Sequence, residues 1–120
     1  MSADQYLLAK FFEWQQKGNG DYRIYVKKAG RYGLAQEFKS DPKFKSEVCE
    51  HLKAYAKGQE KESVLSIIQG IANPESDVLQ IIVGAILDAC GYPDYGNALI
   101  SLGILALIGV TLIALLGSSD

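Results

Sequence analysis

The residues best suited to chemistry in this chain are few, and their spacing matches no familiar site. Cys49, Glu50 and His51 are adjacent, but His51 is the only histidine and the second cysteine, Cys90, lies far along the sequence. Structural zinc sites use closely spaced pairs of ligands. Glu47 and His51 stand one helical turn apart, which is the spacing of an ordinary contact on a helix surface. We therefore expect neither a metal nor a cofactor.

The sequence also lacks the motifs that mark common enzymes. It has no glycine-rich phosphate loop followed by Lys and Ser or Thr, no serine in a recognisable nucleophile context and no paired histidines. We expect a protein that is not an enzyme. Cys49 and Cys90 are not closely spaced and no signal peptide precedes them, so both are expected to be reduced and partly buried.

The most informative stretch is the apolar run from Asn97 to Leu116. It reads NALISLGILALIGVTLIALL and contains no charged residue, histidine or proline. As a helix, residues 98–116 would be about 28 Å long, close to the ~30 Å hydrocarbon core of a bilayer. We expect a transmembrane anchor over 97–117, an interfacial turn over 93–96 and a short tail over 118–120. Tyr92 and Tyr95 precede the anchor, where aromatic side chains mark the membrane interface.

The apolar run has a second interpretation, as a helix sheathed by the rest of a soluble bundle. A pore-forming domain hides its apolar element in this way before insertion. The segment from Asp77 to Cys90 is also nearly apolar all round, but at about 21 Å it is short of a span. It is either the central core helix or a membrane-dipping partner of the anchor.

One side of the expected anchor carries small residues. Small side chains let transmembrane helices approach closely, so this face is expected to join copies of the chain or to dock on another membrane subunit. The residues of this small face are Gly103, Ala106, Val110, Ala114 and Gly117.

Charge is polarised along the chain. All 12 Lys and Arg residues fall between Lys10 and Lys61, so residues 1–61 carry a net charge of +4 and residues 62–120 one of −6. Basic segments remain on the cytoplasmic side of a membrane, although the rule counts charges within ~15–20 residues of the span, and none lie there. We expect residues 1–92 to form a cytoplasmic domain, with no nucleic-acid partner.

Periodicity and capping signals divide residues 1–92 into short helices. We expect helices over 3–17, 22–29, 34–38, 42–57, 60–72 and 77–90. Ser2 and Gln5 form a capping box for the first helix, and Asp41 and Pro42 open the fourth. The aromatic residues of the first helix are expected in the core; the alternative is an interfacial helix with Trp14 at the headgroup level.

These observations predict an all-α fold, a compact bundle of about five short helices followed by a C-terminal transmembrane helix. The expected function is that of a non-enzymatic, tail-anchored membrane protein, acting as a small subunit or a homo-oligomeric interaction module. Its expected partners are the lipid bilayer and either other copies of the chain or other membrane subunits. The alternative is a pore-forming or membrane-permeabilising effector that uses residues 77–116 as a hydrophobic hairpin.

Overall fold

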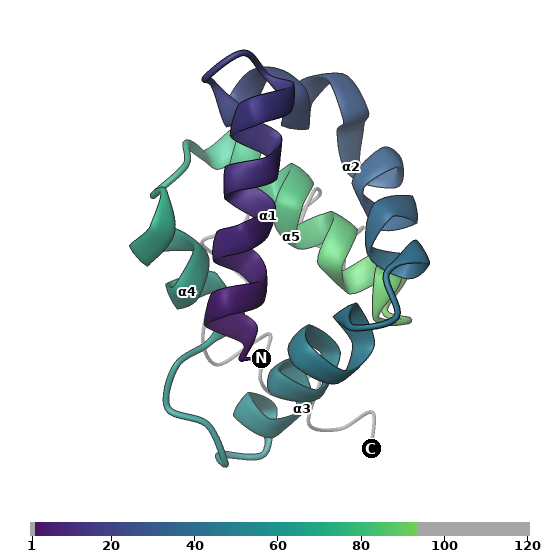
Figure 1. The fold of residues 1–120 in the computed structure, drawn as a ribbon. Helices are drawn as coiled ribbons and strands as arrows, with labels where there is room; N and C mark the ends of the chain where they lie inside the picture. Colours follow the sequence, from purple (N-terminus) through teal and green to yellow (C-terminus); the bar gives the residue numbers. More distant parts are fainter. Residues whose placement is uncertain (1, 94–120) are drawn as a thin grey trace.

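The computed structural model describes residues 2–93, and the regular secondary structure within this range is all helical. Five α-helices and one π-helical turn form a compact bundle, with no strand among the described residues (Figure 1). The prediction of an all-helical bundle is confirmed. The expected transmembrane helix lies outside the described residues, and none of the helices within residues 2–93 has the length and apolarity needed to cross a membrane.

Helix α1 (Ala3–Lys17) begins and ends where its sequence signals predict. The Ser2 hydroxyl accepts the Gln5 backbone N–H at 3.2 Å, and the Gln5 side chain accepts the Ser2 N–H at 3.3 Å, which completes the capping box. Gly18 forms the C-terminal cap. Trp14 is fully buried, and Tyr6 and Phe11 are buried with it, whereas Phe12 is 64% exposed, so the core interpretation is confirmed for three of the four aromatic residues of this helix.

Helix α2 (Tyr22–Ser40) is a pair of helical segments joined at a sharp kink. Asp21 caps its start by accepting the Arg23 N–H at 3.0 Å. Gly30 adopts φ 74° and ψ 175°, a conformation that essentially only glycine tolerates. The sequence predicted a stop at this glycine, and the chain does leave helical geometry there, but it resumes at once and continues past Phe38 to Ser40.

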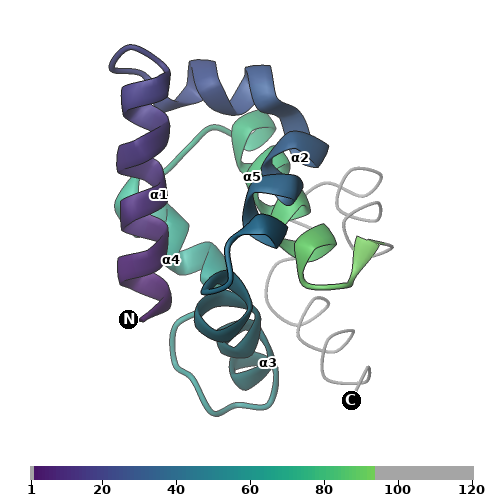
Figure 2. The same ribbon diagram turned by 45° about the vertical axis from the view of Figure 1, so that its right-hand side comes forward.

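The single helix predicted from Pro42 to Lys57 is broken into a turn, the π-helical segment η1 (Lys45–Cys49) and helix α3 (Glu50–Ala56). The Glu50 N–H donates to the Lys45 carbonyl five residues earlier. This wider turn accommodates an extra residue, so adjacent Val48 and Cys49 are both buried. Figures 1 and 2 show α3 at one end of the bundle, beyond the N-terminal end of α1.

Helix α4 (Val64–Ile71) begins four residues later than predicted. The Ser63 hydroxyl accepts the Ser66 N–H at 3.0 Å and so caps the helix at that point. Residues 59–62 are exposed and carry no apolar side chain, so extending the helix over them would bury nothing. Helix α5 (Ser76–Ala89) starts one residue earlier than predicted, and Ser76 is its first residue rather than its cap.

The core lies between α5, α2 and α1. Ile82, Ala85, Ile86 and Leu87 of α5 are fully buried, chiefly against α2. Stacked rings of Phe38 and Phe44, with centroids 4.5 Å apart, extend the core from α2 towards η1. The nearly all-apolar segment from Asp77 to Cys90 is therefore the central core helix of the described domain, the first of the two roles predicted for it.

Candidate functional site

Most of the residues predicted to act at the membrane lie outside the described part of the chain. This applies to Tyr95 and to the small face at 103, 106, 110, 114 and 117. Tyr92 is described: it is partly buried, packs against the core, and its N–H donates to the Leu87 carbonyl at 2.7 Å. These contacts fix the position of the backbone that leads into the apolar segment.

A buried ion pair also holds residues 88–93, where the chain leaves the domain towards the apolar segment. Arg31 donates to Asp88 twice, from Nε at 2.8 Å and from Nη2 at 2.7 Å, and Nη2 also donates to the Pro93 carbonyl at 3.2 Å. The side chains of Arg31 and Asp88 are only 9% and 7% exposed. One guanidinium thus joins α2 to both the last turn of α5 and the backbone beyond it.

The kink in α2 and a glycine in α5 make room for this arginine. Arg31 directly follows Gly30, and a Cβ on Gly84 would lie 3.1 Å from the Arg31 Cδ. The guanidinium stands over the Tyr32 ring, 5.2 Å from its centroid. The hydrogen bonds to Asp88 raise the pKa of Arg31 above its ordinary value, against the opposing effect of burial.

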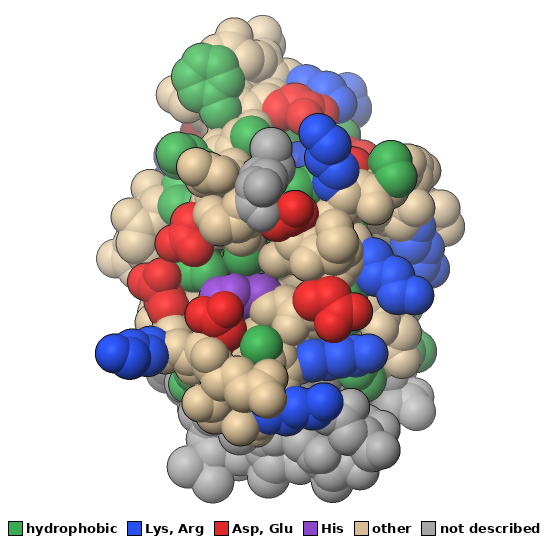
Figure 3. All heavy atoms as spheres, turned by 60° about the horizontal axis from the view of Figure 1, so that its bottom comes forward, with side chains coloured by type: hydrophobic (Ala, Val, Ile, Leu, Met, Phe, Trp, Pro, Cys, Tyr) green, Lys and Arg blue, Asp and Glu red, His purple; other side chains and the backbone are tan. Residues whose placement is uncertain are grey.

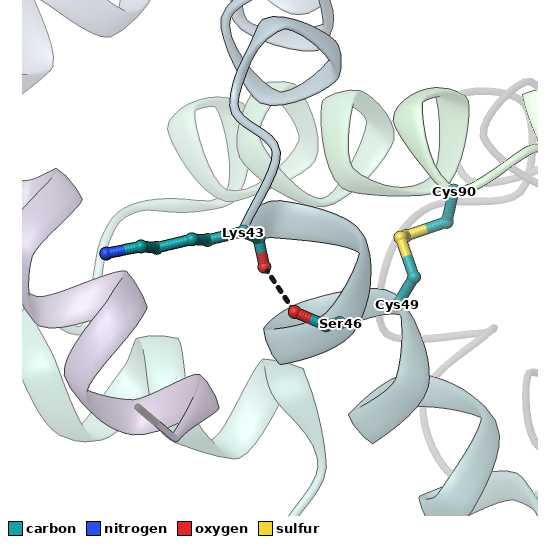
Figure 4. Close-up of a disulfide and its surroundings, with 4 residues drawn as sticks. All are labelled: Lys43, Ser46, Cys49 and Cys90. Atoms are coloured by element: carbon teal, nitrogen blue, oxygen red, sulfur yellow. Dashed lines mark hydrogen bonds between the residues drawn. A yellow bond between two sulfur atoms is a disulfide. The ribbon is translucent and has the colours of Figure 1, made fainter.

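A disulfide joins Cys49, the last residue of η1, to Cys90, which caps the end of α5. The expectation of two reduced cysteines is wrong, because the fold brings together two residues that are 41 positions apart, with Cα atoms at 5.4 Å. Figure 4 shows the bond bridging the two helical segments. We call the disulfide and the contacts of Arg31 with Asp88 and Pro93 the exit clasp.

A second surface feature is an open groove of about 690 Å³ between α1, the start of α2 and the connection from α4 to α5. Leu8 and Phe12 of α1 line it and are 57% and 64% exposed. Ile71 and Pro74 also line the groove. Its polar lining residues include Asp21, Arg23 and Glu75.

Polar side chains between α1 and α2 contact one another around Glu37. Glu37 accepts hydrogen bonds from Trp14 Nε1 at 3.2 Å and from the Tyr25 hydroxyl, and lies 3.8 Å from the Lys10 ammonium. Burial and the Glu37 contact raise the pKa of Tyr25. These groups tie α1 to both halves of α2.

His51 lies on a face of mixed charge. Its Nε2 donates to the Glu62 carbonyl at 2.6 Å, and its Nδ1 lies 4.0 Å from the Glu60 carboxylate. Figure 3 shows acidic and basic side chains interspersed around this single histidine. A face of alternating sign presents no concentrated positive field to anionic lipid.

No group of three or more His, Cys, Asp and Glu side chains in residues 2–93 is arranged to hold a metal ion. Comparisons of the chain with known protein families, with curated proteins and with solved structures gave no match. Function must therefore be inferred from the contacts of the molecule itself.

Two parts of the exit clasp were missed by sequence reasoning. Arg31 and Asp88 are 57 positions apart, and their pairing follows from the packing of α2 on α5, which no local pattern encodes. The disulfide had a weak signal, since the chain contains two cysteines and two can pair. Because the two cysteines are widely spaced in the sequence, the pairing was not predicted.

Proposed function

We propose that this chain is a non-enzymatic, membrane-anchored interaction protein. In this proposal the helical domain of residues 2–93 is held at a bilayer by the apolar segment 97–116, and copies of the chain associate side by side. The observation that carries the proposal is the exit clasp. Three kinds of contact, covalent, ionic and hydrogen-bonded, converge on residues 88–93, directly before the apolar segment.

A fixed exit is useful to an anchored module. Were residues 88–93 loosely attached, the domain would rotate freely about its anchor, and any surface it presents would be oriented at random. Because the clasp connects residues 88–93 to both α2 and η1, it holds the C-terminal end of the described domain in one orientation relative to the bundle. A defined orientation lowers the entropy lost when neighbouring domains associate.

The groove lined by Leu8 and Phe12 is the surface we assign to contact between copies. Its exposed apolar residues favour burial against another protein surface, and its polar lining residues supply hydrogen-bonding groups. A second copy is the favoured occupant because the small face of the anchor, with Gly103 and Ala106 near its start, would bring the domains of two copies together.

The rival proposal, a pore-forming effector with a hairpin over 77–116, is less well supported. Four α5 residues, Ile82, Ala85, Ile86 and Leu87, are fully buried, so releasing this helix into a membrane would open the core. The apolar segment also offers only Ser101, Thr111 and glycines as polar or small groups for a water-filled lumen. The sequence of this segment fits a helix that packs against other helices better than one that lines a pore.

The test of the anchor uses carbonate extraction of membranes from cells expressing the full-length chain. We expect the wild-type protein to remain in the membrane fraction and Leu105→Arg to be released, because a central arginine costs about 2.5–3.5 kcal/mol on insertion scales. Gln36→Arg, at an exposed position of α2, adds the same charge elsewhere and should behave as wild type.

Carbonate release of the wild-type chain would refute the anchor and favour the sheathed-helix interpretation. Dye release from liposomes, measured on the same preparations, separates the two membrane proposals. Leakage caused by the wild-type chain at low density would favour the pore.

A further inference from the structure

The disulfide carries information about the compartment in which the domain resides. The chain has two cysteines and both are in this bond, so no thiol remains in the folded domain. Cys49 is 4% exposed and Cys90 is partly buried. Figure 4 shows the side chain of nearby Lys43 directed away from the two sulfurs. A buried pair of this kind is a structural crosslink.

The spacing of the pair also argues against a redox-active role. Catalytic and exchanging disulfides typically join closely spaced cysteines, with one exposed sulfur of low pKa. Here 41 positions separate the two residues, and the bond closes a loop that contains α3, α4 and all of α5. The chain-entropy model assigns about 4 kcal/mol of stabilisation to a loop of this length. The bond therefore acts by restricting the unfolded chain.

Structural disulfides form and persist in oxidising compartments and are rare where thiol reductants are abundant. We infer that the helical domain lies on the oxidising side of its membrane, rather than in the cytoplasm. Formation of the bond removes two electrons and two protons from the Cys49 and Cys90 thiols. A disulfide-bearing oxidant of that compartment accepts them and becomes a dithiol.

The charge pattern does not oppose this orientation. The positive-inside bias that favoured a cytoplasmic domain counts Lys and Arg near the span, and residues 62–120 contain none. Charge near the apolar segment therefore does not indicate the orientation of the domain across the membrane. The disulfide does, because its formation depends on the redox conditions of the compartment. The membrane part of this inference rests on the proposed anchor, and the redox part does not.

The experiment traps thiols in cells expressing the full-length chain. Acid quenching is followed by a maleimide coupled to polyethylene glycol, which adds a visible mass to each free thiol. We expect no added mass before reduction and two additions after it. The Cys49→Ser/Cys90→Ser variant should show none in either case, and Cys90→Ser alone should show one without reduction.

Protease treatment of sealed vesicles of known orientation tests the side directly. We expect digestion of the domain only from the oxidising face. Two reactive thiols in the quenched wild-type chain would overturn the inference, as would digestion from the cytoplasmic face. An oxidised chain found in the soluble fraction would refute the anchor and leave the redox inference standing, so the two failures are distinguishable.

Discussion

Arg31 and Asp88 illustrate the difference between the value of a buried ion pair and the cost of breaking it. Their side chains are almost entirely removed from solvent, so each loses much of its hydration on folding. The attraction and the two hydrogen bonds offset that loss, and the net contribution of such a pair to stability is small. Leaving one partner alone in the same place is far more costly.

We therefore expect Asp88→Ala to destabilise the domain by about 3–5 kcal/mol, because it leaves the Arg31 guanidinium buried without its carboxylate. The double variant Arg31→Met/Asp88→Leu should lose much less. The measurement is urea unfolding of the full-length chain in a nonionic detergent, followed by fluorescence of the buried Trp14. Equal losses in the two variants would show that the pair is not a coupled unit.

Asp41 gives a prediction of pH dependence. Its carboxylate accepts the Lys43 N–H at 3.0 Å and the Tyr6 hydroxyl at 2.8 Å, and these hydrogen bonds lower its pKa. The folded pKa lies below the unfolded value of about 3.9, so the contribution to stability is full above that value and is lost as the pH falls through the folded pKa.

As the pH falls below about 4, wild-type stability should consequently fall more steeply than that of Asp41→Asn, which keeps a capping oxygen but cannot titrate. Urea midpoints measured at half-unit steps provide the comparison. Other carboxylates contribute to both curves, so the difference between them is the quantity of interest. Parallel curves would mean that Asp41 has no stabilising role as an anion.

At the scale of elements, local patterns predicted the helical class, but the predicted divisions and bounds of the helices differ from those of α2, η1 with α3, and α4. Ser2 and Gln5 form a reciprocal cap, and α1 has the predicted bounds. Ser63 is also a cap, but the charged run before it resembles a first helical turn, which displaced the predicted start of α4. The π-helical turn of η1 has no sequence signal, since it depends on burying Val48 and Cys49 together.

The kink in α2 predicts a selective effect of substitution. Gly30→Ala should destabilise the domain by about 1–3 kcal/mol, since its φ of 74° and ψ of 175° are strained for alanine. A Cβ there would meet nothing within 4 Å, so the loss would come from the backbone alone. Unfolding monitored by circular dichroism measures it.

Gly70→Ala is the matched control. Gly70 lies in α4 without a positive φ, and an alanine Cβ there would meet no atom within 4 Å. Alanine should therefore stabilise the helix by about 0.5–1 kcal/mol. We therefore expect the free energy of unfolding to fall for Gly30→Ala and to rise for Gly70→Ala. Stabilisation by Gly30→Ala would show that α2 straightens without penalty.

At the scale of the whole molecule, the proposed assembly depends on the small face of the apolar segment. Gly103→Leu and Ala106→Leu should each weaken association, because a bulky side chain separates helices that need close approach. Ser101→Leu, which would fall on the opposite side of the proposed helix, should not. Crosslinking in detergent and in membranes measures the copies associated, and equal effects of all three variants would contradict a specific face.

Sequence alone indicated the helical class of the domain and the proposed anchor, yet none of the exit clasp. The reason is physical: capping and periodicity act over a few residues, whereas Arg31 with Asp88 and Cys49 with Cys90 meet only after the bundle has packed. Exposed Phe12 was likewise expected in the core with the other aromatic residues of the first helix, because periodicity identifies a broad apolar side and not which part of it neighbouring elements cover.

The disulfide has a mechanical consequence for a tethered domain. A pull applied through the C-terminal segment reaches Cys90 and crosses the sulfurs to Cys49, so the tension passes to η1, α2 and α1 without entering the intervening chain. The disulfide prevents the chain between the two cysteines, which are 41 positions apart, from being stretched to its full length of roughly 140 Å. Helices α3, α4 and α5 are thereby shielded from load, and the force-bearing part of the protein is its N-terminal half.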